Sequence, residues 1–311
     1  MNWLIKATLQ KCLGSIPGYL SDPLYYAFQR SLGSLRNFNP LSRIAAVDNI
    51  CRIGEIMDFS LKDKRVLEIG TGWCPVVPLF LWIHGSKNVV SCDLNRYFNE
   101  ELLMDALLYI RSNAETIVDT YNFIDPKRLE YVLSNDKYFC KDSVLSGLRD
   151  IGIHYLAPAN AAMLPFEDNY FDLHTSFTVL EHVHPQVIPH IFSEGKRLVR
   201  NEGAFIHCID YSDHFSNNDA KLSQINFLRF NEFAYSFLIS KYSYMNRLRH
   251  DDFLDIFSQI GLSLYVEEPF FCQKVYSQLS SASYSFKVAK PFSLKSIDLL
   301  STTACWFGLK L

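Results

Sequence analysis

Short hydrophobic runs alternate along this chain with longer segments whose apolar positions recur at helical spacing. The runs predict strands at 66–69, 89–92, 153–156, 173–180, 204–209, 262–267 and 304–309. Between them, apolar residues three or four positions apart predict helices at 100–110, 185–199 and 253–260. Strands that alternate with helices in this way favour an α/β protein built on a mostly parallel sheet.

Three segments lie outside that alternation. Residues 1–60 are apolar but broken repeatedly by glycine and proline, which predicts a helical N-terminal extension of a main domain over 61–311. In its first helix Ile5, Leu9 and Leu13 recur at helical spacing, which is typical of a helix covering a core and less often of one on a membrane surface. Two insertions are expected in the main domain, a mostly helical one at about 111–151 and an aromatic, lid-like one at about 211–250.

Composition narrows the class of protein. The 311 residues are 49% hydrophobic, enough for a sizeable core, and the net charge of −3 gives no basic field for nucleic acid. The eight cysteines contain no C-x-x-C pair, which favours buried thiols in a reducing, cytoplasmic setting. No apolar run is long enough to span a bilayer. The expected partner is a small-molecule or glycan substrate, with a homodimer possible.

The stretch Val66–Pro75 carries the clearest chemical signal. An apolar run with one acid, Glu68, ends in the closely spaced glycines Gly70 and Gly72, so a strand should lead through a tight turn into a helix. A dinucleotide site would place a third glycine where the chain has Pro75, and Glu68 would repel a pyrophosphate. A cationic ligand suits this carboxylate better. A buried strand followed by an ordinary glycine turn is the simpler alternative.

Four motifs in order extend this reading. Val66–Gly72 resembles motif I of class I S-adenosylmethionine-dependent methyltransferases, and Asp93 matches their motif II acid, 21 residues (93 − 72) after Gly72. Residues 160–172 resemble the family's D-A-x-x-L-P-F-x-D-x-x-F-D segment, and residues 179–183 resemble the motif after its fourth strand. The resemblance implies a Rossmann-like seven-stranded sheet of order 3-2-1-4-5-7-6, with the last strand antiparallel. It also implies S-adenosylmethionine as cofactor and S-adenosylhomocysteine as product.

The resemblance assigns cofactor roles to single residues. Gly70 and Gly72 would admit the methionine portion, Glu68 would support its amino group, and Asp93 would hold the ribose hydroxyls. Asn160, where the family usually has Asp, would meet adenine together with Ala161; an amide can still accept from the adenine amino group. The remaining expected contacts are Thr71 and Leu94 beside these residues, and Ser176 or Phe177 flanking the sulfonium.

Candidates for a general base are the histidines at strand ends, because imidazole exchanges protons near neutral pH. His214 follows the fifth strand and opens the lid-like insertion, and His182 follows the fourth; Asp210 or Asp213 would orient either ring or act directly. The expected substrate contacts are Tyr211, Asn246, Arg247 and Arg249. Glu181, His182, His184 and His190 lie close in sequence, but their spacing does not match a zinc signature, so no metal is expected.

The leading interpretation is therefore a methyltransferase that acts on a hydroxyl of a small polar acceptor, such as a sugar, a glycan or a secondary metabolite. Two alternatives remain at this point. One is a non-catalytic subunit that binds the same cofactor beside a partner enzyme. The other is a nicotinamide-dependent oxidoreductase, against which Glu68 and Pro75 argue.

Overall fold

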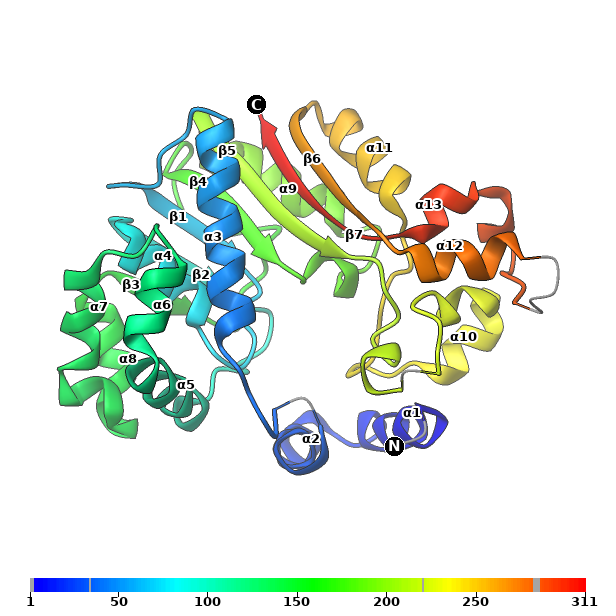
Figure 1. Ribbon diagram of the computed structural model, residues 1–311, viewed down its shortest axis with the longest axis horizontal. Helices are drawn as coiled ribbons and strands as arrows, with labels where there is room; N and C mark the ends of the chain where they lie inside the picture. The colour runs from blue at the N-terminus through cyan, green and yellow to red at the C-terminus, as the bar shows by residue number, and fades with distance from the viewer. Residues whose placement is uncertain (1–2, 34, 220, 282–285) are drawn as a thin grey trace.

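A computed structural model describes residues 3–33, 35–219, 221–281 and 286–311. They form a seven-stranded sheet with helices packed around it (Figure 1). The strand order is β3-β2-β1-β4-β5-β7-β6, as expected. Its strands are β1 (Arg65–Ile69), β2 (Asn88–Cys92), β3 (Ile153–Leu156), β4 (Phe171–Phe177), β5 (Val199–Asp210), β6 (Ser263–Phe271) and β7 (Thr302–Lys310). Strands β1 to β5 pair in parallel, whereas β7 runs antiparallel between β5 and β6. The expected α/β fold class and the antiparallel last strand are confirmed.

Helices account for most of the remaining chain. They are α1 (Trp3–Gly14), α2 (Gly18–Leu32), α3 (Leu41–Ile56), α4 (Val76–His84), α5 (Glu100–Ser112), α6 (Ala114–Thr120), α7 (Pro126–Leu133), α8 (Lys141–Asp150), α9 (Ile188–Leu198), α10 (Glu232–Leu238), α11 (His250–Ile260), α12 (Gln273–Ser280) and α13 (Ile297–Ser301). Short 3-10 turns are η1 (Asp136–Phe139), η2 (Leu180–His182), η3 (Ser216–Asn218), η4 (Asn226–Arg229) and η5 (Phe292–Leu294). The insertion at 111–151 is helical, as expected, but the pattern gave no sign of α12 and α13.

Both faces of the sheet are covered by helices, and the strands alternate their side chains between two cores. Val66 belongs to the core beneath α3 and α4, whereas its neighbour Leu67 belongs to the core beneath α9 and α11. Helix α3 supplies Ile44, Val47 and Ile50 to the first core, all of them buried. Helix α3, although it lies within residues 1–60, thus packs directly on the sheet; below, the term extension refers to α1 and α2 alone.

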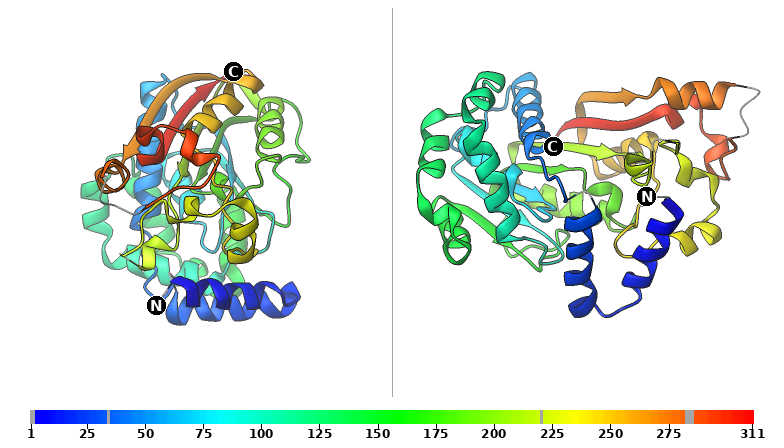
Figure 2. Two further views of the ribbon diagram at one scale, coloured as in Figure 1. Left: turned by 90° about the vertical axis from the view of Figure 1, so that its right-hand side faces the viewer. Right: turned by 60° about the horizontal axis from the view of Figure 1, so that its bottom comes forward.

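The extension lies against the lid segment, residues 211–250, at the bottom of Figure 1, and the second view of Figure 2 shows the same neighbours. The Lys11 ammonium on α1 donates to the carbonyls of Ser236 and Ile239, at 2.8 and 2.9 Å. The apolar positions of α1 do not cover a core as the spacing predicted, because Ile5 and Leu9 are exposed. In the described part of the chain, no helix is long and apolar enough to cross a membrane.

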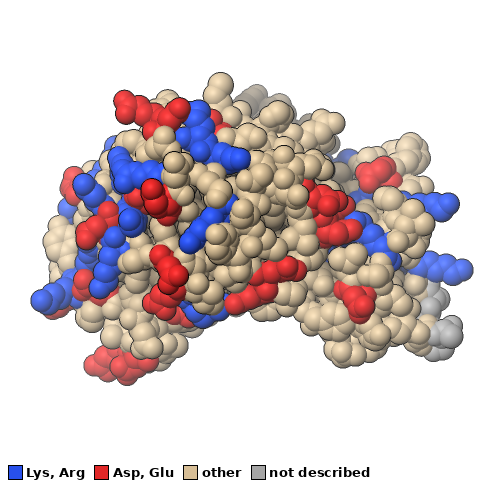
Figure 3. Space-filling model, turned by 90° about the horizontal axis from the view of Figure 1, so that it is seen from above, with Lys and Arg blue, Asp and Glu red and all other residues tan. Residues whose placement is uncertain are grey.

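The lid segment has its own small core. Ile225, Phe227 and Leu228 of the lid pack with Val275 of α12 and Leu300 of α13. Several lid aromatics thus hold the lid to the C-terminal part of the chain. On the face seen from above in Figure 3, acidic and basic side chains are interspersed rather than gathered by sign.

A chain of hydrogen bonds between two histidines and a serine lies inside the sheet. His174 Nδ1 is 3.1 Å from His207 Nε2, and His207 Nδ1 is 2.8 Å from Ser176 Oγ. Burial lowers the pKa of His174 to about 3 and holds the pKa of His207 well below 6.5. Both rings therefore stay neutral in the folded chain.

These two histidines should make the protein acid-sensitive. Below pH 6.5 the two histidines become protonated in the unfolded chain but stay neutral in the folded chain. The free energy of unfolding therefore falls as the pH drops, by up to about 1.4 kcal/mol per pH unit for each ring. Chemical denaturation between pH 7 and 4.5 should show a shallower pH dependence of the unfolding free energy for His174→Gln/His207→Gln than for wild type. His154→Gln, at an exposed position of β3, is the control. Equal slopes for the double variant and the wild type would contradict this account.

Candidate functional site

The expected cofactor residues gather where the parallel strands end. Glu68 of β1 stands opposite Ser91 of β2 and Thr175 of β4, so the loops that follow these three strands leave the sheet at one edge. The Gly70 amide continues the ladder by donating to the Cys92 carbonyl at 2.8 Å. Ligands of open α/β sheets bind at this edge, beside the point where the strand order reverses.

The two glycines of the turn have different reasons to be glycine. Both have positive φ, 80° at Gly70 and 64° at Gly72, which side chains disfavour. A Cβ at Gly70 would lie 2.5 Å from both methyl groups of Val179, whereas a Cβ at Gly72 would meet no atom within 4 Å. Gly70 is therefore required by packing against the loop after β4. Gly72 borders open space, as expected of a backbone that a ligand approaches.

Glu68 and Asp93 come together around this turn. The Gly72 amide donates to Asp93 Oδ2 at 2.8 Å, and the Asn95 amide donates to Oδ1 at 3.2 Å. Burial raises the pKa of Glu68 to about 7, partly opposed by the Ser91 hydroxyl, while the charge of Asp93 adds to the rise. Burial also raises the pKa of Asp93. Two desolvated carboxylates side by side form a site that favours a cation.

The other expected cofactor residues divide into exposed and buried groups. Leu94, which directly follows Asp93, is 67% exposed. Asn160 is also exposed, and its loop is held to the end of β2 because the Ala159 amide donates to the Asp93 carbonyl at 2.8 Å. These positions, with the half-buried Ala161, can meet a flat ring. Thr71 is buried, and its hydroxyl contacts the Glu68 carboxylate and Ser91.

Ser176 and Phe177 at the end of β4 are also less open than the resemblance implied. Ser176 is buried and bonded to His207, and Phe177 is half-buried with its ring stacked on Trp306 at 5.9 Å. The structure thus gives Ser176 an internal contact and leaves only Phe177 partly accessible.

Arg43, near the start of α3, was missed from the sequence. Its charge acts on Glu68 and Cys74, which places the guanidinium near the glycine corner, the name used below for the turn at Gly70 and Gly72 together with Glu68 and Asp93. Burial lowers the pKa of Arg43, and its guanidinium lies 4.8 Å from the centre of the Phe38 ring. Among the described residues it makes no hydrogen bond. An arginine in the N-terminal part carries no local pattern that marks it as a neighbour of Glu68.

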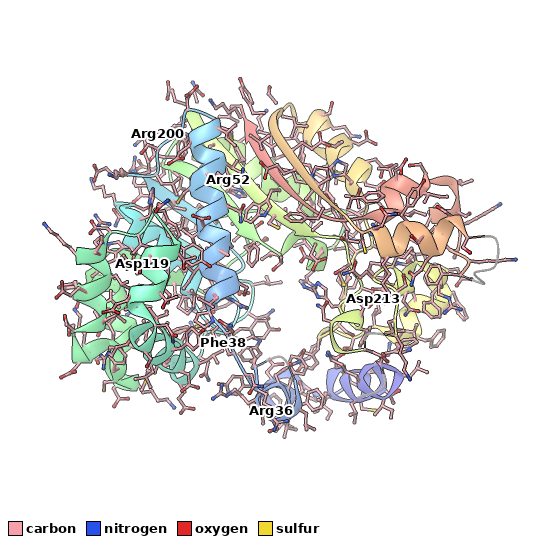
Figure 4. All side chains as sticks on the ribbon, in the orientation of Figure 1. Arg36, Phe38, Arg52, Asp119, Arg200 and Asp213 are labelled. Atoms are coloured by element: carbon pink, nitrogen blue, oxygen red, sulfur yellow. The ribbon has the colours of Figure 1, made fainter. Side chains whose placement is uncertain are left out.

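A cavity of about 300 Å³ opens beside this edge, between the extension and the lid segment. The three candidate catalytic residues, His182, Asp213 and His214, are part of its lining. Figure 4 shows Asp213 on the lid, across the centre of the molecule from Phe38. The remaining walls come from Lys6, Gln10, Tyr25, Gln29, Phe215, Asn217, Phe227, Tyr235, Tyr242, Ser243 and Met245. Helices α1 and α2 thus form part of the pocket, which their sequence did not reveal.

A second hollow, of about 610 Å³, lies on the helical insertion around Asp119, far to the other side in Figure 4. Its lining is mostly apolar and contains no histidine or cysteine. It is distant from the strand ends that carry the expected cofactor residues.

Asp210, rather than Asp213, holds the imidazole of His214. His214 Nε2 lies 3.2 Å from Asp210 Oδ2. Asp213 instead accepts hydrogen bonds from the Phe215 amide at 2.9 Å and from the Asn226 side chain at 3.3 Å. Burial alone would lower the pKa of His214, but the hydrogen bond and charge of Asp210 outweigh it and raise the pKa above 6.5.

His182 completes a pair of imidazoles and is held from a different side. Its ring centre is 4.9 Å from that of His214, and its Nδ1–H donates to the Tyr244 carbonyl at 2.8 Å. The ring is accessible from the cavity yet surrounded by protein, so desolvation lowers its pKa to about 4. Beside both rings lies Glu181, a buried carboxyl that sequence reasoning considered only for a metal.

The four expected substrate contacts have internal roles instead. Arg249 is fully buried and donates to the carbonyls of Tyr211 and Thr302, both at 2.6 Å, and of Leu300 at 3.2 Å. Arg247 donates to the Phe227 and Phe230 carbonyls and pairs with Glu232. Neither arginine lines the cavity, and Tyr211 is buried. Asn246 bonds to the carbonyls of Leu180 and Val183, at 2.7 and 2.9 Å.

Comparison with known proteins gives one family match. Residues 139–207 match the family model described as a methyltransferase domain, a segment that runs from η1 into β5 and leaves out the glycine turn. None of the curated proteins matches the chain at a significant level.

Among solved structures, three illustrate the resemblance. An S-adenosylmethionine-dependent methyltransferase from Mesorhizobium loti is 14% identical (TM-score 0.48; 86% of this chain and 100% of that one). The PH0226 protein of Pyrococcus horikoshii is 15% identical (TM-score 0.47; 93% and 98%). The magnesium protoporphyrin IX methyltransferase of Synechocystis, solved with bound S-adenosylhomocysteine, is 11% identical (TM-score 0.44; 87% and 83%). Because the identities and TM-scores are this low, the fold assignment rests on the strand order of the chain itself.

The sheet order and the matched domain define the class: this is a class I methyltransferase fold. The match to a methyltransferase domain covers residues 139–207, and the sequence resemblance implies S-adenosylmethionine as the cofactor. The residues present fit that molecule, since the turn leaves open space at Gly72 beside two carboxylates that favour a cation.

The two glycines provide a matched pair of variants. Gly72→Ala should weaken S-adenosylmethionine binding at least tenfold, because the methyl group enters the open space, while strain at positive φ costs about 1 kcal/mol of stability. Gly70→Ala should instead lower the melting temperature much more, because its methyl meets Val179. Calorimetric binding and thermal unfolding separate the two effects. Unchanged affinity in Gly72→Ala would place the ligand elsewhere.

The pKa of Glu68 predicts how binding depends on pH. Because this pKa is about 7, the carboxyl is mostly neutral at pH 5.5 and mostly charged at pH 7.5, while the ligand's ammonium remains largely protonated. Affinity for S-adenosylmethionine should therefore rise several-fold between these values. Glu68→Gln should bind more weakly and lose most of this dependence. An equally steep rise in Glu68→Gln would assign the titration to another group.

Proposed function

We propose that this protein methylates a hydroxyl oxygen of a small polar acceptor, such as a sugar, a glycan or a secondary metabolite, bound in the cavity between the extension and the lid. The observation that carries the proposal is the position of the cavity. It places an imidazole held by a carboxylate, His214 on Asp210, at the same sheet edge as the glycine corner. S-adenosylmethionine supplies an electrophilic methyl group on a sulfonium.

The cofactor roles follow from the corner. Glu68 keeps one oxygen, Oε1, without a hydrogen-bond partner among the described residues, so it can accept from the ligand's ammonium. Arg43, whose charge acts on Glu68, is the basic group that we assign to the ligand's carboxylate. Asp93 holds the ribose hydroxyls, and Asn160, Ala161 and Leu94 border the adenine.

The cavity lining supports a polar acceptor with hydroxyl groups. Gln10 is buried, and its Oε1 has no hydrogen-bond partner in the described part of the chain, so a ligand that donates a hydrogen bond would satisfy it. Tyr25 and Tyr242, whose rings stack at 4.0 Å, also line the cavity, and the Gln10 side chain donates to the Tyr25 hydroxyl at 3.3 Å. Polar groups beside an aromatic surface suit a sugar or a hydroxylated ring.

His214 is placed to accept the proton that the acceptor loses. Its Nε2–H donates to Asp210, which fixes the ring and leaves Nδ1 without a hydrogen bond to any described residue. A hydroxyl becomes a far better nucleophile as its proton leaves, and positioning supplies the rest of the rate. Asp213 lies on the cavity wall and holds the lid loop around His214, while His182 packs against the His214 ring.

The proposal is tested first by cofactor binding and then by label transfer. Wild-type protein should bind labelled S-adenosylmethionine, and Asp93→Ala should lose that binding. Incubation with a panel of sugars, glycosides and phenols should then move the label to one acceptor class as an acid-stable ether. Binding without transfer to any acceptor would favour the alternative, a non-catalytic partner subunit.

Removing the proton acceptor should slow the reaction without affecting the cofactor. For His214→Asn we expect turnover of the acceptor found by the panel to fall by about 10² to 10⁴, the usual contribution of general base catalysis. Affinity for S-adenosylmethionine should stay within twofold of wild type, because the ring does not belong to the glycine corner. His154→Asn is the matched control, with unchanged turnover. Normal turnover in His214→Asn would remove this residue from the mechanism.

A further inference from the structure

Glu181 is the least satisfied ionisable side chain of this site. Only 2% of the residue is exposed, and neither carboxyl oxygen has a hydrogen-bond partner among the described residues. Isolating a carboxylate from water without partners costs several kcal/mol, so such a group requires a proton or a cation next to it. Among the described residues, no lysine or arginine acts on this carboxyl, and the only side chain whose positive charge would stabilise its ionised form is His214 when protonated.

Two imidazoles face the same point. One ligand atom from each of Glu181, His182 and His214 can be chosen so that all three lie within 4.8 Å of one another. Ligand atoms around an ion bound at about 2.1 Å lie about 3.4 Å apart in a tetrahedral site, so a modest contraction would close the cluster. Both histidines border the cavity, which leaves a further coordination position directed toward the acceptor.

The surroundings of the cluster hold these side chains in the arrangement that metal sites use. The Nδ1–H of His182 donates to the Tyr244 carbonyl, and Nε2 of His214 bonds to Asp210, so each ring offers its other nitrogen. Metal-binding histidines are typically oriented in this way by a carbonyl or a carboxylate. The turn that carries Glu181 and His182 is held by Asn246, whose amide N–H donates to the Glu181 carbonyl at 2.8 Å.

We propose that Glu181, His182 and His214 bind one divalent transition-metal ion of the zinc type, with an open position facing the acceptor cavity. Two imidazoles and one carboxylate are a ligand set that Zn²⁺ and Co²⁺ accept with a position left for a substrate or water. The spacing along the chain gave no metal signature, because the third ligand comes from the loop after a different strand.

The role of the ion, although not its binding, rests on the proposed function. A hydroxyl bound to a divalent cation is more acidic, so the ion would lower the pKa of the acceptor at the point where methyl transfer needs an oxyanion. His214 would then act by holding the ion, and its ring would accept the proton directly only in the metal-free protein.

Cobalt titration tests the site without any need for turnover. Chelator-treated wild-type protein should take up one equivalent of Co²⁺ with a visible ligand-field absorption band, and Zn²⁺ should abolish the band. Affinity should fall at least tenfold in Glu181→Gln and in His214→Asn, and also in Asp210→Asn, which removes the carboxylate behind His214. His154→Asn is the matched control and should bind Co²⁺ as wild type does.

Binding of S-adenosylmethionine, measured on every variant, shows whether the chain is folded. The proposal is overturned if folded wild-type protein takes up no Co²⁺, or if Glu181→Gln and His214→Asn bind it as tightly as wild type. Its failure is distinguishable from failure of the proposed function. If chelator-treated protein transfers the label but takes up no Co²⁺, the metal site is refuted and the proposed methyl transfer stands. If the protein takes up Co²⁺ but transfers no label, the metal site stands and the proposed methyl transfer is refuted.

Discussion

The hydrogen bond from the Gly72 amide to Asp93 joins the two halves of the glycine corner. It connects the turn after β1 with the end of β2 over 2.8 Å, and the backbone at Gly72 has a positive φ of 64° in this turn. With the turn held in this way, Glu68 stays buried beside Asp93 and the space next to Gly72 stays open. The other expected cofactor contacts, at Leu94 and Asn160, depend on the same strand end, because the loop carrying Asn160 is bonded to the Asp93 carbonyl.

The parallel sheet extends this constraint to the acceptor side. Strand β4 pairs in parallel with β1, and β5 pairs in parallel with β4, so the segments after β4 and β5 carry Glu181, His182, Asp210 and His214 to the same edge. Hydrophobic side chains on both faces fix that register, since a shift by one residue would turn Val66 and Leu67 toward the wrong cores. The site is thus a product of strand pairing.

The sequence predicted what depends on local pattern. Alternating strands and helices, the glycine turn and the acid at the end of β2 are all features of short contiguous segments, and the structure has them where they were expected. Arg43, Gln10 and Tyr25 were missed because only tertiary packing brings α1, α2 and α3 to the site. The positive charge of an arginine also did not reveal whether its side chain is buried. Arg247 and Arg249 were expected to face a substrate, but they donate hydrogen bonds to backbone carbonyls inside the chain. Between Asp210 and Asp213, only the coordinates reveal which one meets His214.

The bond between Lys11 and the Ser236 carbonyl joins residues separated by 225 positions. The bond between the Gly72 amide and Asp93, in contrast, joins residues only 21 positions apart. During synthesis from the ribosome, the corner can therefore assemble early. The acceptor cavity must wait until most of the polypeptide has emerged and its first helices can close against the lid, because distant contacts form only after a long loop has been closed.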